Sequence, residues 1–216
     1  MSSASARPFR FTSSESRWMA FVDGENLTLR GQRFADTHGI ALQQSAWFEK
    51  NSFLWIPGLS VIDVVRFGDG HGPYAIPLRS YYYATVEGGT DAIPKVEDSL
   101  WRLGFHPEVF HKRKDDTRAK GMDLTVARDL LSHAFRDNYD VALLFAGDGD
   151  YVPLVEEIKR LGKTVVVLFF SDTGLSRDLR MASDHFFAID RAFEHGWRGA
   201  FVRLQAEAAA ASASGG

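Results

Sequence analysis

Two carboxylates separated by a glycine, in Gly147-Asp148-Gly149-Asp150, directly follow the apolar, β-prone stretch Leu143–Ala146. If that stretch is a buried strand, both acids lie at its carboxyl end, where open α/β sheets place their ligands. The glycines allow a tight turn, so Asp148 and Asp150 can point at one place. Neighbouring carboxylates disfavour each other's ionisation, and a hard cation such as Mg²⁺ or Mn²⁺ relieves the repulsion. The plainer alternative is a polar turn in which Asp150 only caps a helix over Val152–Leu161.

Two further acids occupy comparable positions. Asp23, in Asp23-Gly24-Glu25-Asn26, follows the apolar stretch Trp18–Val22. Asp123 falls in the first turn of a helix predicted over Met122–Phe135, where the alternative is that it only complements the helix dipole. Asp129 lies six residues further on, about 240° around that helix from Asp123. We therefore expect Asp129 either to support the site without touching an ion or to form an ion pair.

Strands and helices alternate along the chain from Trp18 to Ile189, which predicts an α/β fold with a mainly parallel sheet and helices on both faces. Apolar and β-branched runs predict strands, and 3.6-residue periodicity predicts helices. The predicted strands are Trp18–Val22, Phe53–Ile56, Val61–Phe67, Arg79–Val86, a short one beginning at Phe105, Tyr139–Phe145, Thr164–Phe170 and Phe186–Ile189. The predicted helices are Leu27–His38, Ile93–Leu103, Met122–Phe135, Val152–Leu161 and Leu175–Ala182. In Met122–Phe135 the apolar repeat consists of Leu124, Ala127, Leu130, Leu131 and Ala134.

This alternation places four acids, Asp23, Asp123, Asp148 and Asp150, at strand ends or helix starts. In a doubly wound sheet those positions share one edge and can converge where the strand order reverses. Four acids in one cleft fit one or two divalent ions, which activate water, orient a phosphodiester and stabilise the leaving oxygen. The amide of Asn26 suits a metal-bound water or a phosphate oxygen.

Three motifs in this order resemble the NYN domain, a family of the PIN-like nuclease superfamily that includes the LabA/DUF88 proteins. The motifs are Phe21-Val22-Asp23-Gly24-Glu25-Asn26, Lys120-Gly121-Met122-Asp123 and Gly147-Asp148-Gly149-Asp150-Tyr151. The closing segment, Leu179 with Ala182-Ser183-Asp184-His185-Phe186, is similar to the last helix and strand of the family. The resemblance spans roughly Trp18 to Ala192.

The resemblance implies a three-layer α/β/α PIN-like fold and an (endo)ribonuclease that depends on Mg²⁺ or Mn²⁺. It implies that Asp23, Asp123 and Asp148 bind the metal with Asp150 as the fourth acid, and that Asn26 is their polar partner. The chain departs from the family at Gly149, where a small hydroxyl residue is common, and in a long stretch from Phe53 to Leu78. The part of that stretch from Phe67 to Pro77 suggests either a dimer contact in a homo-oligomer or a gate for substrate.

A basic segment precedes Asp123, and we expect it to hold the backbone of RNA beside the metal site, because cations on phosphates supply most sequence-independent affinity. The alternative is a solvated charged loop, since Asp115 and Asp116 dilute the patch. The residues concerned are Lys112, Arg113, Lys114, Arg118 and Lys120. Tyr81, Tyr82 and Tyr83 could stack on bases, but a tyrosine-rich strand is more often core and sheet surface.

Length and composition set the remaining limits. The chain has 216 residues and no cysteine, which excludes a disulfide scaffold and a thiol nucleophile. Its net charge of −3 argues against a protein that coats nucleic acid by charge alone. No apolar run has the length of a membrane span, and we expect a cytoplasmic protein that does not use a membrane. We expect a disordered leader over 1–17, one domain over 18–204 with its insertion around 53–78, and a low-complexity tail over 205–216.

Two other functions are considered. Aspartyl-phosphate chemistry, as in haloacid-dehalogenase-like phosphatases, would start from Asp23. It is disfavoured because Glu25 stands where that mechanism needs an aspartate. The other is a PIN-like module that binds RNA or a protein without cutting. The presence of all four acids counts against this alternative.

Overall fold

A computed structural model describes residues 16–39, 77–87, 89–102, 104–112 and 121–190. The leader up to residue 15, the predicted insertion up to residue 76 and the tail from residue 205 lie outside the described residues. So do the basic residues Arg113, Lys114, Arg118 and Lys120. The predictions made for these segments stay predictions.

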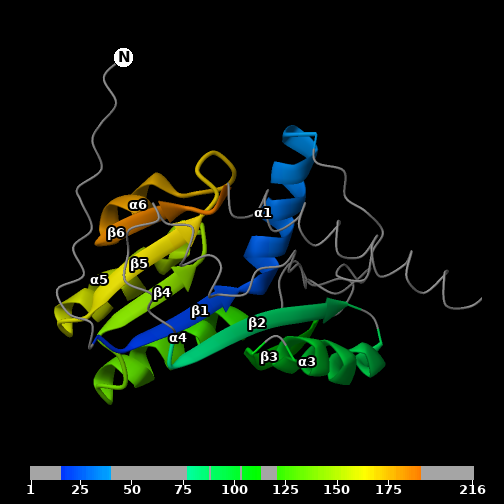
Figure 1. Ribbon diagram of the computed structural model, residues 1–216, viewed down its shortest axis with the longest axis horizontal. Helices are drawn as coiled ribbons and strands as arrows, with labels where there is room; N and C mark the ends of the chain where they lie inside the picture. Colours follow the sequence, from blue (N-terminus) through cyan, green and yellow to red (C-terminus); the bar gives the residue numbers. More distant parts are fainter. Residues whose placement is uncertain (1–15, 40–76, 88, 103, 113–120, 191–216) are drawn as a thin grey trace, which may run out of the picture.

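Within the described residues, six parallel strands form one sheet in the order β3-β2-β1-β4-β5-β6 (Figure 1). The predicted α/β class with a parallel sheet is therefore confirmed. The strands are β1 (Trp18–Asp23), β2 (Arg79–Glu87), β3 (His106–Lys112), β4 (Val141–Phe145), β5 (Thr164–Phe169) and β6 (His185–Ala188). The chain builds β1, β2 and β3 toward one side, then crosses to β4 and continues toward the other side.

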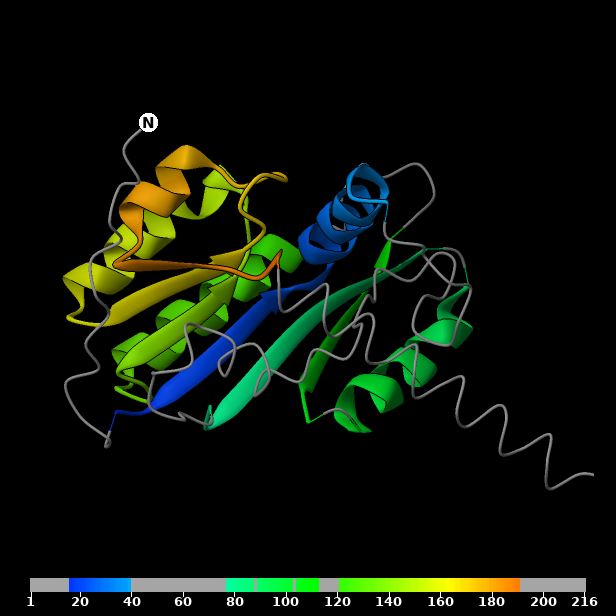
Figure 2. The ribbon, with the colours of Figure 1, turned by 45° about the horizontal axis from the view of Figure 1, so that its top comes forward.

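Helices cover both faces of this sheet and complete three layers (Figure 2). The helices are α1 (Gly24–Thr37), α3 (Ile93–Arg102), α4 (Met122–Phe135), α5 (Val152–Arg160) and α6 (Arg177–Ala182), with 3-10 turns η1 (Thr90–Ala92) and η2 (Gly149–Tyr151). One core joins the sheet to α1 and α3, and the other joins it to α4, α5 and α6. Among the described residues, no helix is long and apolar enough to cross a membrane.

Strand β1 shows how the alternation of side chains directs an acid to one face. Ala20 and Val22 lie in the core beneath α1 and α3, whereas Met19 and Phe21 lie in the core beneath α4 and α5. Successive residues of a strand point to opposite faces, so Asp23 follows Phe21 onto the side of α4 and α5. The strand thus delivers its terminal carboxylate toward the two helices that carry the other acidic motifs.

Two local features differ from the prediction. Helix α1 begins at Gly24 rather than Leu27, because the Asp23 carboxylate caps it by accepting from the backbone N–H of Asn26. In α4, Leu124 is 76% exposed instead of belonging to the buried stripe. That stripe repeats every four residues and consists of Met122, Val126, Leu130 and Ala134.

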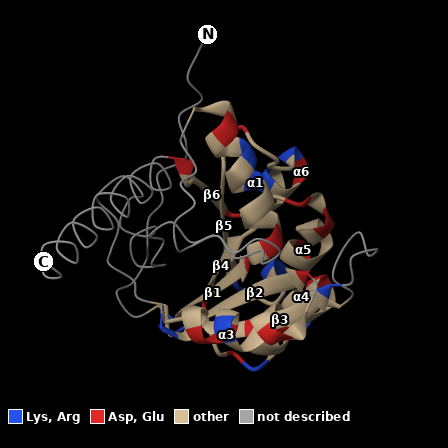
Figure 3. Cartoon of the chain, turned by 90° about the vertical axis from the view of Figure 1, so that its right-hand side faces the viewer, with Lys and Arg blue, Asp and Glu red and all other residues tan. Residues whose placement is uncertain are grey.

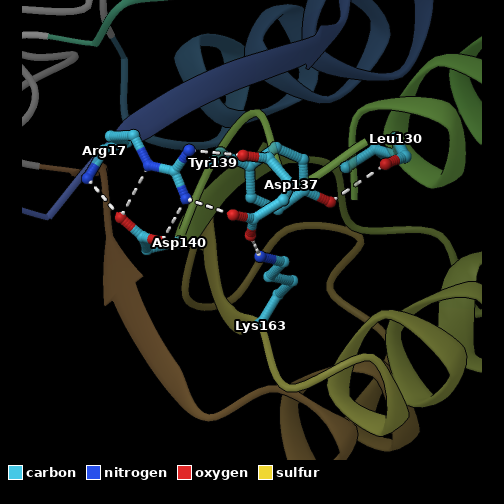
Figure 4. A network of polar contacts seen from close by, with 6 residues as sticks. All are labelled: Arg17, Leu130, Asp137, Tyr139, Asp140 and Lys163. Atoms are coloured by element: carbon cyan, nitrogen blue, oxygen red, sulfur yellow. Dashed lines mark hydrogen bonds and ion pairs between the residues drawn. The ribbon is translucent and has the colours of Figure 1, made fainter. Parts of the chain in front are cut away.

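The amino edge of the sheet is held by charge pairs (Figure 4). Arg17, just before β1, donates from its backbone N–H and Nη2 to the carboxylate of Asp140, at 2.8 Å in each case. Arg17 also binds Asp137, which receives a second cation from Lys163. Hydrogen bonds from these cations hold the pKa values of Asp137 and Asp140 below the usual range. The acids of this edge are thus neutralised within the protein.

Candidate active site

The acidic motifs meet at the carboxyl edge, where the strand order reverses between β1 and β4. These two strands are hydrogen-bonded neighbours, with Val22 in register with Phe145. Asp23 ends β1, and Asp148 follows β4 by three residues. Because the chain leaves the two strands in different directions, a crevice opens between them in folds of this kind, and ligands bind there.

Asp23 is a buried carboxylate at this edge, with only 3% of the residue exposed. Its Oδ1 accepts from the Asn26 backbone N–H at 2.9 Å, and its Oδ2 accepts from the Tyr151 hydroxyl at 2.9 Å. Burial raises the pKa of Asp23 to about 7, and the charges of Asp123 and Glu25 add to the rise while both hydrogen bonds oppose it. No lysine or arginine within the described residues forms an ion pair with this carboxylate.

Tyr151 lies among the acids and is a site residue that the sequence patterns did not predict. Its hydroxyl is buried, and burial followed by the charges of Asp23, Asp123 and Asp148 raises its pKa well above the ordinary value. Three of the four predicted acids therefore act electrostatically on one phenol. The available signal was its place directly after Gly149-Asp150, but only the fold shows that it reaches back to β1.

Asp148 and Asp150 do not have the roles of the plainer alternative, in which Asp150 caps the helix that follows. The Oδ1 of Asp148 accepts from the backbone N–H of Asp150 at 3.1 Å, so Asp148 caps the 3-10 turn η2. Asp150 is exposed in that turn, and Asp123 is exposed in the first turn of α4. Helix α5 has Tyr151 as its N-cap and no side-chain cap hydrogen bond, so Asp150 does not cap it, and Asp148 caps only the preceding turn.

Asn26 ties the first motif to the third. Its Oδ1 accepts from the backbone N–H of Gly147 at 3.1 Å, which leaves its Nδ2 without an acceptor among the described residues. Gly147 has no room for a side chain, since an added Cβ would lie 2.3 Å from the Phe169 ring and 2.6 Å from the Gly174 carbonyl oxygen. These contacts fix the position of the loop after β4 against α1 and against the loop after β5.

Asp129 belongs to a neighbouring cluster. It accepts from the Tyr83 hydroxyl at 3.0 Å and forms an ion pair with Arg128 at 2.8 Å. Tyr83 is in register with Asp23 on the adjacent strand. Of the two alternatives for Asp129, the ion pair is therefore present, and the contact with β2 places it beside the acidic edge. The burial of Tyr82 and Tyr83 also agrees with the core reading of this strand.

Lys112 does not occupy the exposed position expected for a phosphate-binding cation. Only 6% of the residue is exposed, and its Nζ lies 2.8 Å from Oε1 of Glu25, which is buried as well. The hydroxyl of Thr85 donates to the other oxygen of Glu25 at 2.9 Å. Lys112 is the last residue of β3, and the alternation of side chains along the strand directs it inward. The prediction of an exposed basic segment did not take this strand position into account.

The donor set of this edge suits a hard divalent cation. Carboxylates are the oxygen ligands that Mg²⁺ and Mn²⁺ prefer, and the buried Asp23, crowded by Asp123, would be relieved by a positive charge. Within the described residues, however, no three His, Cys, Asp or Glu side chains lie close enough to share one ion.

Comparison with known proteins agrees with the α/β fold described above. The NYN domain model matches residues 17–190. A crystal structure of a Vibrio parahaemolyticus protein of unknown function is similar, with a TM-score of 0.53 and 22% identity, over 82% of this chain and 95% of that one. That similarity supports the fold alone, and no curated protein gives a significant match. The narrower LabA/DUF88 assignment stays a prediction. The chain belongs to the NYN domain family, a PIN-like nuclease family.

Proposed function

We propose that this protein is a metal-dependent ribonuclease that hydrolyses phosphodiester bonds of RNA. The observation that carries the proposal is Asp23, a buried carboxylate without a cationic partner in the described residues, at the carboxyl edge beside Asp123 and Asp148. Membership of a PIN-like nuclease family supports it. At the opposite edge, by contrast, Asp137 and Asp140 form ion pairs with Arg17, and Asp137 also forms one with Lys163.

In this proposal Asp23, Asp123, Asp148 and Asp150 hold one or two Mg²⁺ or Mn²⁺ ions. When bound, such an ion supplies an activated water and neutralises charge on the phosphate. The chain orients Asp23 through the Asn26 N–H and the Tyr151 hydroxyl, so the position of this ligand is restricted before an ion binds. The Nδ2 of Asn26 donates to a phosphate oxygen, since its Oδ1 is already held by Gly147.

The test is cleavage of a labelled single-stranded RNA and a structured RNA with Mn²⁺, with Mg²⁺ or with EDTA. Asp148→Asn keeps the shape of the cap but removes a ligand charge, and we expect its rate to fall at least about a hundredfold. Asp36→Asn, an exposed acid near the far end of α1, is the matched control and should cut like the wild type. A circular RNA of the same sequence separates internal cleavage from trimming at ends.

A second candidate is a PIN-like module that binds RNA without cutting it. It is favoured by one observation: the acids within the described residues do not form a ready three-ligand group. This alternative predicts no cleavage of any of the RNAs with either metal, and RNA binding that EDTA and Asp148→Asn leave unchanged. That combined result would replace the nuclease proposal.

A further inference from the structure

Arg30 extends the face of α1 that contacts the third motif. It stands four residues after Asn26, and residues with this spacing lie one turn apart on the same side of a helix. The Asn26 side chain reaches Gly147 from this side. Arg30 is thus the next long side chain of α1 on the side where Asn26 contacts the third motif.

The loop after β5 shapes a place for the Arg30 side chain. An added Cβ on Gly174 would lie 2.4 Å from both Cδ and Nε of Arg30, so the guanidinium end packs against this glycine. Gly174 has a φ of 77°, a conformation that favours glycine. Its carbonyl oxygen faces Gly147, and Ser176 donates its backbone N–H to the Gly147 carbonyl at 2.7 Å. The views in Figures 1 and 2 show this loop beside α1.

The charge of Arg30 is not matched by an acid in the described part of the chain. Arg17, Arg128 and Arg160 each form an ion pair with an aspartate or glutamate, whereas no hydrogen bond or ion pair to Arg30 is found there. Its side chain is half-buried against the loop, so its position is restricted before any ligand binds. A restricted guanidinium binds phosphate in a two-pronged manner at a smaller entropy cost than a free surface cation.

We propose that Arg30 binds a backbone phosphate of the RNA next to the bond that is cut. This inference rests on the proposed function, because it takes RNA as the ligand of the acidic edge. An edge with several carboxylates repels a polyanion, and the chain as a whole carries a net charge of −3, so cations beside the acids must hold the strand. Figure 3 shows basic positions on α1, the helix that starts at the acids.

The test measures binding apart from cleavage. A labelled single-stranded RNA is titrated with the full-length protein in EDTA at several salt concentrations. We expect Arg30→Gln to raise Kd about three- to tenfold and to reduce the slope of log Kd against log salt by about 0.7, the value for one lost phosphate contact on a single strand. Arg30→Lys keeps the charge without the fork and should restore the slope but only part of the affinity.

Arg136→Gln is the matched control, since it removes the same charge at the C-terminal end of α4 and should change neither quantity. Equal effects of Arg30→Gln and Arg136→Gln would show that only overall charge matters and would overturn the proposal. So would an unchanged Kd and slope for Arg30→Gln, or a wild type that does not bind RNA.

Cleavage separates this proposal from the nuclease proposal. Arg30→Gln should raise KM while kcat stays within about twofold, because the contact is made equally before and during the reaction. Asp148→Asn should lose kcat and still bind RNA in EDTA. If the wild type cuts no RNA but Arg30→Gln still weakens binding with the reduced salt slope, the nuclease function fails and the phosphate contact of Arg30 stands.

Discussion

Asp23 is held in surroundings that oppose its charge. Its two hydrogen bonds, from the Asn26 N–H and the Tyr151 hydroxyl, favour the carboxylate, but burial outweighs them and brings its pKa to about 7. Asp140, at the other end of the sheet, has the opposite balance, because Arg17 lowers its pKa. Two aspartates of one fold therefore affect stability with opposite signs, and only Asp23 stands to gain from an added cation.

The first prediction concerns Asp23→Asn in EDTA. The folded state holds the proton of Asp23 up to a pH of about 7, whereas the unfolded chain releases it near 3.8. Wild-type stability thus contains a contribution that falls as the pH rises through this window. Asparagine stays neutral and can still cap α1. We expect the variant to match the wild type near pH 4 and to exceed it by up to about 4 kcal/mol at pH 8, measured by urea unfolding.

Asp140→Asn is the control for that experiment, since its sign is reversed. The lowered pKa of Asp140 stabilises the folded protein above the unfolded pKa, and that contribution is lost as the pH falls through the folded value. The Asp140→Asn variant should therefore be less stable than the wild type at pH 7 and approach it in acid. Parallel pH profiles for the wild type and Asp23→Asn would contradict the assignment of a raised pKa to Asp23.

At the scale of elements, a buried ion pair connects α1 to the sheet beneath the acidic edge. Glu25 lies in the first turn of α1, and Lys112 lies at the end of β3, with Thr85 of β2 between them. A buried pair is weak evidence for net stability, but removing one partner leaves an uncompensated charge. The pair thus fixes how the first turn of α1, which Asp23 caps, is placed against β2 and β3.

The second prediction is that Lys112→Met destabilises the protein by about 3–5 kcal/mol, because Glu25 is left charged and buried. The double variant Glu25→Gln with Lys112→Met should recover a large part of this loss, as measured by urea unfolding at pH 7. Lys95→Met, at an exposed position of α3, is the control and should change stability by less than about 0.5 kcal/mol. Additive effects of the two substitutions would show that the pair is not coupled.

At the scale of the whole molecule, the sequence is sufficient for the layout and insufficient for the contacts. Periodicity locates the strands and places Asp23 and Asp148 at strand ends, because these signals are local. Two contacts of the site join distant parts of the chain. The hydrogen bond from Tyr151 to Asp23 spans 128 positions, and that from Lys112 to Glu25 spans 87, so no local sequence pattern predicts either contact. Leu124 shows the same limit, since an apolar residue on a helix faces solvent wherever no neighbouring element covers it.

The last prediction follows from the division of the molecule into a neutralised amino edge and an acidic carboxyl edge. An ion that binds the folded protein alone stabilises it by mass action, by about 2.7 kcal/mol at a hundredfold excess over Kd. For a chain of this size that corresponds to a rise in Tm of roughly 5–10 °C. We expect Mn²⁺ to produce such a rise in the wild type, and a larger one at pH 8 than at pH 6, because binding must displace the proton held by Asp23.

The same variants locate the ion. Asp23→Asn and Asp148→Asn each remove a carboxylate of the acidic edge, so both should lose most of the Mn²⁺-induced rise in Tm. Asp36→Asn removes the same charge near the far end of α1 and should keep the rise. An equal rise in all four proteins would place the ion away from this edge. No rise in the wild type at millimolar Mn²⁺ would leave Asp23 only the role of a cap for α1 and favour the non-catalytic module.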